Sequence, residues 1–345
     1  MTEPTEPFLT HALPGIGGRI RATPEDFQVD ERPLYLPCGE GEHLYVKITK
    51  RGLSTPDLVR RISSTLGVKA QAIGVAGLKD ARAVTTQMVS LQGIHPEQIS
   101  RLPIDDQILK VETLARHRNR LRTGHHAGNH FRLVIREIAG HAAETVPTIL
   151  GQLSRRGVPN YFGPQRQGKG GDNYQTGAAL LNDPRRRDTT MSRAKRIWYL
   201  NTYQSFLFNR VLARRIDHID HVFVGDWATK LENGACFQVE DAEKEQPRVD
   251  RFEISPTGIL FGSRVSWAGG EPGRIEEAVM AEAGTTRDAL VTAAKACGFR
   301  GERRALRIPL AELEWSLDGS VLTLAFALPP GAYATGVLRE LMKTG

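Results

Sequence analysis

The chain has 345 residues, of which 40% are hydrophobic and 25% are charged, an ordinary globular composition that excludes extensive disorder. Its length exceeds what one hydrophobic core usually holds, so we expect two domains. No run of about 18 apolar residues occurs, and the N-terminal stretch has neither a basic leader nor an apolar segment. We therefore expect a cytoplasmic protein with no membrane partner.

The charge balance favours a polyanionic partner. Lys and Arg total 46 against 39 acidic residues, which gives a net charge of +7. The three cysteines, Cys38, Cys236 and Cys297, are far apart, odd in number and form no CxxC pair. This pattern excludes a cysteine zinc site and a dithiol redox site, and it predicts buried free thiols.

The basic residues are concentrated in two runs. Residues 116–136 carry six arginines and four histidines with no acid, and residues 185–196 carry six basic residues and one acid. A single charge run is often only a solvated face of the protein. Two arginine-rich runs together favour phosphate contact, because a guanidinium group binds phosphate oxygens in a bidentate manner.

In the first half of the chain, hydrophobic periodicity predicts strands at residues 43–49, 83–91 and 131–137. Residues 72–78, AIGVAGL, fit a short buried strand or turn that leads into a loop. A helix is predicted over residues 55–67, with Thr55 as the N-cap, Pro56 at the first helical position and Gly67 at the end.

In the second half, residues 201–216 place an apolar stripe at helical spacing and predict a deeply packed helix. Residues 332–343 predict a C-terminal helix that docks on the core, with Tyr333 among its apolar positions. Between them, residues 155–303 change to Gly-, Arg- and Asn-rich loops with short apolar runs. We interpret this stretch as an inserted domain.

The stretch GVAGLKDARAVTTQ is the most informative for chemistry. Its small-residue turn exposes Lys79, Asp80 and Arg82 between two predicted strands. Neighbouring cations keep a carboxylate ionised, so Asp80 can act as a nucleophile or a base at neutral pH. The alternative, from the residues alone, is an ordinary charged turn.

This stretch resembles the signature of the TruD family of tRNA pseudouridine synthases, and further motifs resemble the same family in the same order. These motifs are TPEDFQVDE, KRGLST, GNHFRLVIR, VPNYFGPQR, NTYQSFLFN and LPPGAYATGVLREL, so the resemblance spans essentially the whole chain. It implies that Asp80 is the catalytic residue, that the substrate is the uridine at position 13 of tRNA, and that neither a cofactor nor a metal takes part.

The resemblance also implies which side chains bind the substrate. Phe27, Asn129 and Phe131 match positions that line the family's active site, Phe326 is a weaker match and Tyr333 is weaker still. The first three also have structural alternatives: a staple for Phe27, a turn residue for Asn129 and a core residue for Phe131. The family commonly has an arginine where this chain has His130, so an arginine contact is either absent there or replaced by the imidazole.

The fold implied by the resemblance is mixed α/β (α+β). A pseudouridine-synthase catalytic domain with a mixed sheet and flanking helices is expected from residues 1–154 and 304–345. Residues 155–303 are expected to form the inserted α/β domain, with an RNA-binding cleft between the two.

Several residues are candidates for contact with RNA. The loop VPNYFGPQRQGKG combines aromatic and basic side chains, as suits stacking and phosphate contact. The full candidate set is Lys79, Arg82, Arg118, Arg120, Arg122, Tyr161, Arg166 and Lys169. The same loop nearly matches the phosphate-binding P-loop motif, but the match fails because Gly170 occupies the position where the motif has Ser or Thr.

Other protein classes fit the sequence less well. His95 and Glu97 have the HxE spacing of zinc deaminases, but the required CxxC is absent. An RNA methyltransferase lacks its glycine-rich cofactor loop here. A non-catalytic RNA-binding or RNA-chaperone protein would explain the charge and aromatics equally well, but it gains nothing from an anion such as Asp80 beside phosphates.

Overall fold

The computed structural model describes residues 6–168, 171–182 and 191–344. Two compact units arise from discontinuous segments. We call Gly15–Val146 with Leu310–Ala334 and Thr344–Gly345 the sheet unit. We call Met1–Pro14, Pro147–Pro309 and Thr335–Lys343 the helical unit. The domain boundaries expected from the sequence stay a prediction.

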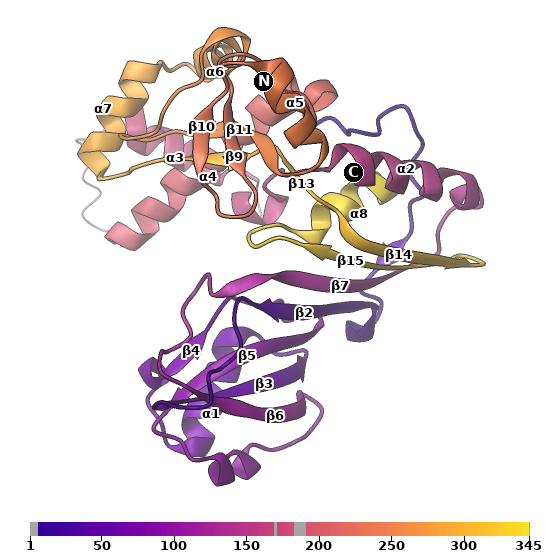
Figure 1. Ribbon diagram of the computed structural model, residues 1–345, viewed down its shortest axis with the longest axis vertical. Coiled ribbons are helices and arrows are strands. Elements are labelled where there is room, and N and C mark those ends of the chain that lie inside the picture. Colours follow the sequence, from indigo (N-terminus) through magenta and orange to yellow (C-terminus); the bar gives the residue numbers. More distant parts are fainter. Residues whose placement is uncertain (1–5, 169–170, 183–190, 345) are drawn as a thin grey trace. The chain divides into compact units, whose positions relative to one another are not determined.

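The sheet unit is built on a nine-stranded mixed sheet (Figure 1). The main path runs β14-β15-β7-β2-β5-β3-β6, with β1 paired to β7 and β4 paired to β5. Only the β2–β5 pairing is parallel among the described strands of this sheet. Its strands are β1 (Arg19–Ile20), β2 (Phe27–Pro33), β3 (His43–Arg51), β4 (Ile73–Val75), β5 (Val84–Gln92), β6 (Ile108–His117), β7 (His126–Arg136), β14 (Ala311–Asp318) and β15 (Val321–Leu328).

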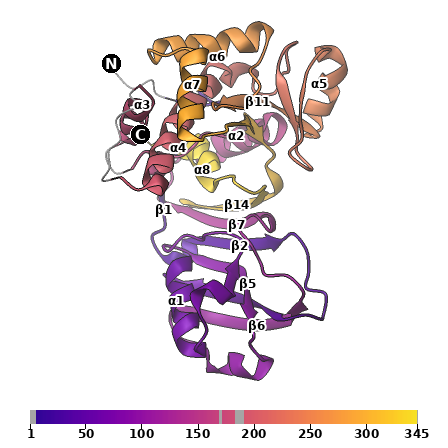
Figure 2. The same cartoon turned by 90° about the vertical axis from the view of Figure 1, so that its left-hand side faces the viewer.

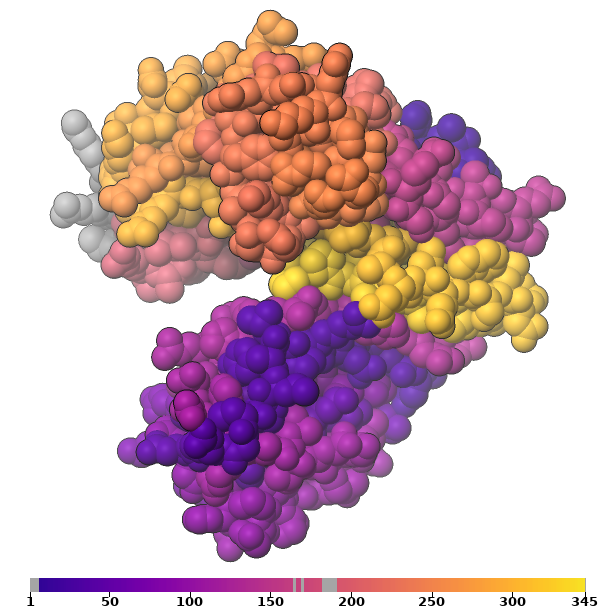
Figure 3. Space-filling model, viewed as in Figure 1, coloured from indigo at the N-terminus to yellow at the C-terminus, as the bar shows by residue number. Residues whose placement is uncertain are grey.

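Segments far apart in sequence share this unit, and indigo and magenta residues lie intermingled on its surface (Figure 3). The strands predicted from periodicity are confirmed. The predicted strand at 131–137 is part of the longer β7, which ends at Arg136 because Glu137 adopts a φ of 59°. Short 3-10 helices complete the unit: η1 (Pro24–Asp26), η2 (Ala70–Ala72) and η3 (Pro96–Arg101).

Helix α1 (Thr55–Leu66) covers one face of this sheet (Figure 2). Leu58, Ile62 and Leu66 recur at helical spacing and pack on the apolar residues of β3 and β5. The predicted N-cap was wrong by one residue, since the hydroxyl of Ser54 accepts the hydrogen bond from the Asp57 N–H. The helix ends as predicted at Gly67, whose φ of 69° suits glycine.

The helical unit packs helices around a smaller sheet of order β10-β9-β11-β12, with β13 paired to β8. Its strands are β8 (Val158–Pro159), β9 (Trp227–Lys230), β10 (Cys236–Gln238), β11 (Ile254–Leu260), β12 (Glu302–Ala305) and β13 (Arg307–Ile308). Its helices are α3 (Asn173–Asn182), α4 (Arg193–Arg214), α5 (Ala242–Asp250), α6 (Gly270–Glu282), α7 (Arg287–Cys297) and α8 (Ala334–Met342), with 3-10 helices η4 (Pro164–Gln167) and η5 (Ile216–His218). Helix α2 (Ala142–Arg156) contains the boundary between the units.

The helix predicted at 201–216 covers the C-terminal part of α4, which begins eight residues earlier, where Ser192 caps it through the Lys195 N–H, and ends at Arg214, two residues before the predicted end. Leu207 and Val211 belong to the core that α4 shares with β11 and α6. The predicted C-terminal helix is confirmed as α8, with Leu341 fully buried. Tyr333 lies before that helix and is 37% exposed, so its predicted packing position was wrong.

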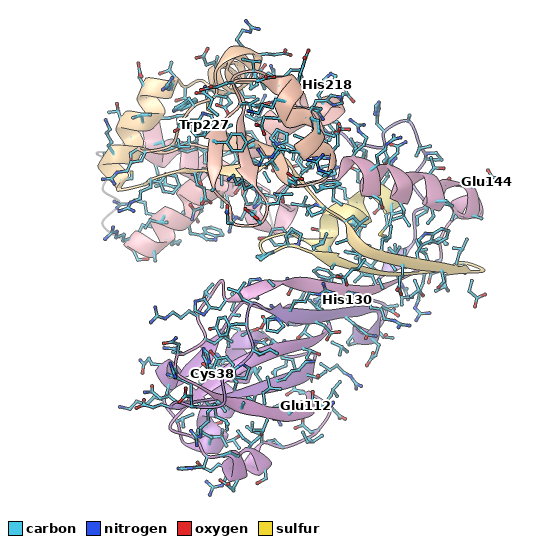
Figure 4. The ribbon with its side chains drawn as sticks, in the orientation of Figure 1. Cys38, Glu112, His130, Glu144, His218 and Trp227 are labelled. Atoms are coloured by element: carbon cyan, nitrogen blue, oxygen red, sulfur yellow. The ribbon has the colours of Figure 1, made fainter. Side chains whose placement is uncertain are left out.

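The prediction of buried thiols was also wrong. Cys38 and Cys236 are exposed and Cys297 is partly buried, and Cys38 lies at the surface of the sheet unit (Figure 4). Among the described residues, no helix has both the length and the apolar character needed to cross a bilayer.

Candidate active site

Asp80 lies in the loop between β4 and β5, with 39% of its side chain exposed. Its Oδ1 accepts a hydrogen bond from the backbone N–H of Arg82 at 3.0 Å. Its Oδ2 accepts one from the guanidinium of Arg21 at 2.5 Å. A carboxylate has about four acceptor positions, so this one can still reach a substrate while its orientation is fixed.

Contacts of the residues that precede Asp80 hold its loop. The Lys79 Nζ lies 2.6 Å from the Glu31 Oε2, and the two side chains are only 6% and 0% exposed. The Lys79 N–H donates to the Thr55 Oγ1 at 2.9 Å, which ties the loop to the first turn of α1. Earlier in the same loop, the Ala76 carbonyl accepts a hydrogen bond from the Gly124 N–H at 2.8 Å. The loop therefore presents Asp80 from a fixed backbone.

Arg21 connects Asp80 to an aromatic side chain. Its guanidinium carbon lies 4.2 Å from the centre of the Phe27 ring, a cation–π distance. Its φ of 57° is uncommon for a residue other than glycine. Phe27 is positioned in turn by Asp26, whose carboxylate binds Arg136 of β7 at 2.7 Å, and this hydrogen bond lowers the pKa of Asp26.

A row of three phenylalanines extends from Arg21 across the neighbouring strands β2, β7 and β15. Phe131 meets Phe27 edge-on at 6.4 Å and stacks on Phe326 at 5.5 Å between ring centres. Phe131 and Phe326 are also register partners across β7 and β15. The three side chains are 4%, 6% and 0% exposed for Phe27, Phe131 and Phe326. They form an apolar floor beside Asp80.

Asn129 lies on β7 two residues before Phe131, so strand alternation puts both on the same face of the sheet. The preceding residue must be glycine: Gly128 has a φ of 136°, and a Cβ there would lie 2.4 Å from the Leu328 carbonyl oxygen. His130 falls on the opposite face and is drawn on β7 in Figure 4. The departure from the family pattern at His130 therefore does not alter the Asn129 face.

Polar atoms without partners gather on this face. The Asn129 Oδ1 is buried and has no hydrogen-bond partner among the described residues. Such groups are rare in folded proteins, and an absent ligand is one reason for them. Within the described part of the sheet unit, four more side-chain atoms near this face are buried and unpartnered: Arg21 Nε, Thr85 Oγ1, Gln87 Nε2 and His126 Nδ1.

Lys50 adds a buried cation. It is 0% exposed, it donates from Nζ to the Leu53 carbonyl at 2.5 Å, and burial lowers its pKa to about 8. The Asp80 carboxylate acts on it in the opposite direction and favours its charged form. Asp80 thus lies in the field of Lys50 as well as that of Arg21.

Comparisons with known proteins identify the family. The protein-family model described as tRNA pseudouridine synthase D (TruD) matches residues 5–190 and 189–341 of this chain. Relatives named tRNA pseudouridine synthase D include one from Geobacter sulfurreducens, 42% identical over 97% of this chain and 96% of its own length. Another from Thermus thermophilus is 43% identical over 98% of this chain and 92% of its own. This chain belongs to the TruD family. It is a tRNA pseudouridine synthase, which is an isomerase.

The fold agrees with this assignment. A solved structure from Methanosarcina mazei, named as a tRNA pseudouridine synthase D, covers 100% of this chain with a TM-score of 0.82 at 24% sequence identity. The mixed α/β fold predicted from the sequence, with its large mixed sheet and helices, is therefore the TruD fold.

Within this TruD chain, the structure brings together the residues that the resemblance singled out. Asp80, Phe27, Asn129, Phe131 and Phe326 all lie in the sheet unit, and the aromatic contacts above connect three of them.

Sequence reasoning missed the cation next to Asp80. The carboxylate pairs with Arg21 and not with its neighbours Lys79 and Arg82. Lys79 faces Glu31 in the interior, so it is not placed to contact RNA, and Arg82 contributes its backbone N–H. Nothing in the local sequence marks Arg21, because its partner is 59 residues away.

The predicted RNA contacts in the basic run have different environments. Arg118 pairs with Glu40 on the surface, and the Arg120 guanidinium donates to the Ile73 carbonyl at 2.6 Å. Arg122 is exposed and has no ion pair among the residues the structure describes. Of these three candidates, Arg122 is thus the one most open to a phosphate.

The candidates in the helical unit are less exposed. Tyr161 is 7% exposed, and its hydroxyl donates to the Pro7 carbonyl at 3.3 Å, so its hydroxyl is engaged within the helical unit and its contact with RNA stays a prediction. The Arg166 guanidinium lies 5.4 Å from the Phe162 ring centre. Lys169 and residues 185–190 of the second basic run lie outside the described residues.

Proposed function

We propose that this enzyme converts the uridine at position 13 of tRNA into pseudouridine and that Asp80 is its catalytic carboxylate. The observation that carries the proposal is the setting of Asp80: a partly exposed carboxylate, oriented by Arg21 at 2.5 Å, beside buried phenylalanines and buried polar atoms without partners. The position in tRNA rests on the resemblance of this chain to its family.

The chemistry suits a single carboxylate. The C1′–N1 glycosidic bond breaks, the uracil turns, and a C1′–C5 bond forms while C5 loses a proton and N1 gains one. The reaction is an isomerisation without net oxidation. An ionised Asp80 can begin it by attack on C6, by attack on C1′ or by removal of a C2′ proton, and all three routes require a fixed anion beside the ribose and base.

The uracil has to leave its stack to reach this site. Phe27, Phe131 and Phe326 are at most 6% exposed and line a sheet face, which a base inside a helix cannot contact. We assign the flat face of the uracil to this aromatic floor. Its polar edge has donors and acceptors to match in the unpartnered Asn129 Oδ1 and its neighbours.

We also propose that the sheet unit carries the catalytic function of the domain predicted from residues 1–154 and 304–345, because Asp80 and the four substrate-binding candidates lie in it. The domain predicted at 155–303 would then be the inserted one. The cytoplasmic location expected from the sequence stays a prediction.

Position-resolved mapping of pseudouridine in tRNA tests this function. We expect the purified protein alone, in the presence of EDTA, to produce pseudouridine at position 13 and at no other uridine of the same tRNA. Product at a different position would contradict the assigned substrate. Tight tRNA binding without product at any position would instead support the RNA-binding alternative.

A further inference from the structure

The side chain of Leu78, two residues before Asp80, is exposed to solvent. It is 77% exposed, more than any other large apolar side chain of the described residues. Exposed leucines are common on protein surfaces, and exposure alone carries no function. What distinguishes Leu78 is that hydrogen bonds hold the backbone on both sides of it.

Both sides of Leu78 are anchored. The Ala76 carbonyl is bonded to the Gly124 N–H, and the Lys79 N–H is bonded to the Thr55 hydroxyl. The side chain of Lys79 is fixed in the buried pair with Glu31. Leu78 therefore projects from a rigid loop that also presents the Asp80 carboxylate.

Movement of the uracil to the buried aromatic floor leaves a gap in the RNA stack, and the Leu78 side chain can fill that gap. A uracil that leaves its stack to reach Phe131 exposes the faces of the two bases that flanked it, which is unfavourable in water. An apolar side chain that enters the vacated space covers those faces, as apolar wedges do between base steps in other nucleic-acid complexes.

We propose that Leu78 is a positioning residue that inserts into the tRNA stack in place of the target uracil. The inference rests on the proposed function of Asp80, since it takes the site beside that carboxylate as the destination of the base. Leu78 is in contact with the neighbouring bases and takes no part in the bond changes.

A pair of leucines tests the proposal. Leu36 is 74% exposed and lies in another loop of the same unit, so Leu36→Ala is the matched control for Leu78→Ala. Single-turnover rates are compared on folded tRNA and on a short unstructured RNA with the same sequence around the uridine. We expect Leu78→Ala to slow the reaction on folded tRNA by about tenfold and on the short RNA by less than about twofold, because loss of the apolar side chain matters only where a stack must be opened.

Leu78→Met, which keeps an apolar side chain of similar size, should restore the rate on folded tRNA, and Leu36→Ala should leave both rates unchanged. An equal loss of rate on both RNAs would show that Leu78 acts only on the loop structure and would overturn the proposal. No loss on either RNA would overturn it as well.

Base extrusion can be followed apart from catalysis. With 2-aminopurine next to the target uridine, Asp80→Asn should give a rise in fluorescence on binding, and Asp80→Asn with Leu78→Ala should give a much smaller rise. Equal rises would refute the role of Leu78 and leave that of Asp80 intact. Full turnover by Asp80→Asn would refute the proposed function whatever the fluorescence shows.

Discussion

Arg21 and Asp80 form an ion pair of 2.5 Å across 59 residues of sequence. Arg21 leaves β1 in a left-handed backbone conformation and rests on the Phe27 ring, so one side chain connects the carboxylate to the aromatic floor. The pair aligns Asp80 while half of the carboxylate's acceptor positions stay open.

Replacement of this arginine should lower turnover with little effect on folding. For Arg21→Ala we expect kcat to fall by about 10- to 100-fold, and the melting temperature to change little, because a partly exposed ion pair stabilises a fold by at most about 1 kcal/mol. Arg21→Lys should recover part of the activity.

Arg19→Ala is the matched control for this experiment. Arg19 lies two residues earlier on β1, is 62% exposed and is 3.8 Å from Glu137. Single-turnover kinetics and thermal unfolding on the same preparations separate the two positions. Equal activities for Arg21→Ala and Arg19→Ala would show that the pair with Asp80 has no role in the reaction.

Asn129 offers a test of the substrate-binding face. Its buried Oδ1 has no partner among the described residues, so Asn129→Ala removes an unpaired polar atom and should leave the free energy of unfolding within about 1 kcal/mol of wild type. The kcat/KM for tRNA should fall by about tenfold or more, because the uracil loses a hydrogen bond. A large loss of stability with an unchanged kcat/KM would make Asn129 a structural residue.

The sequence alone was sufficient for elements whose signals are local. Periodicity placed β3, β5 and α8, and glycine marked the end of α1. Local signals failed where a side chain is used at long range. The hydroxyl of Thr55, predicted as a helix cap, instead accepts a hydrogen bond from the Lys79 N–H, and Ser54 caps the helix.

The candidate site also contains residues that local motifs identify and residues that only the long-range contacts of the fold reveal. Asp80 and the four substrate-binding candidates were named from motifs, and the structure gathers them in one unit. Arg21 and the Lys79–Glu31 pair were not foreseen, because they arise from the strand order β7-β2-β5, which no motif encodes. Composition could not separate Arg122, which is open to solvent, from Arg120, which is occupied by a carbonyl.

Arg122 and Arg120 should therefore behave differently in RNA binding. We expect Arg122→Ala to weaken tRNA binding and to lower the slope of log Kd against log salt by about one unit, as one lost phosphate contact does. Arg120→Ala should change the salt slope less and should lower thermal stability more, since the guanidinium supports the Ile73 carbonyl. A salt titration of both variants measures this, and an unchanged slope for Arg122→Ala would exclude a phosphate contact there.

Lys50 predicts a dependence of stability on pH. Its pKa in the folded chain is about 8, below the ordinary 10.5, because burial disfavours the charged ammonium. Between those values the unfolded chain binds more protons, so stability rises with pH, and below about 8 the fold carries the full cost of the buried charge. Lys50→Met should thus be more favourable at pH 7 than at pH 10, by up to about 3 kcal/mol.

Urea unfolding of wild type and Lys50→Met at the two pH values measures this difference, and the lost hydrogen bond to Leu53 affects both values alike. Lys47→Met, at an exposed position on the same strand, is the control and should show no such difference. The same effect of Lys50→Met at pH 7 and pH 10 would mean that the buried ammonium carries no cost.

The central claim, that the Asp80 carboxylate performs the reaction, is tested most directly by single-turnover pseudouridine formation with Asp80→Asn. This substitution keeps the size of the side chain and removes its charge, so the variant can neither attack carbon nor accept a proton at neutral pH. With the melting temperature and the tRNA Kd measured on the same preparation, we predict near-native folding, tRNA affinity equal to or slightly above wild type, and no detectable product. Turnover within about tenfold of wild type would contradict the claim.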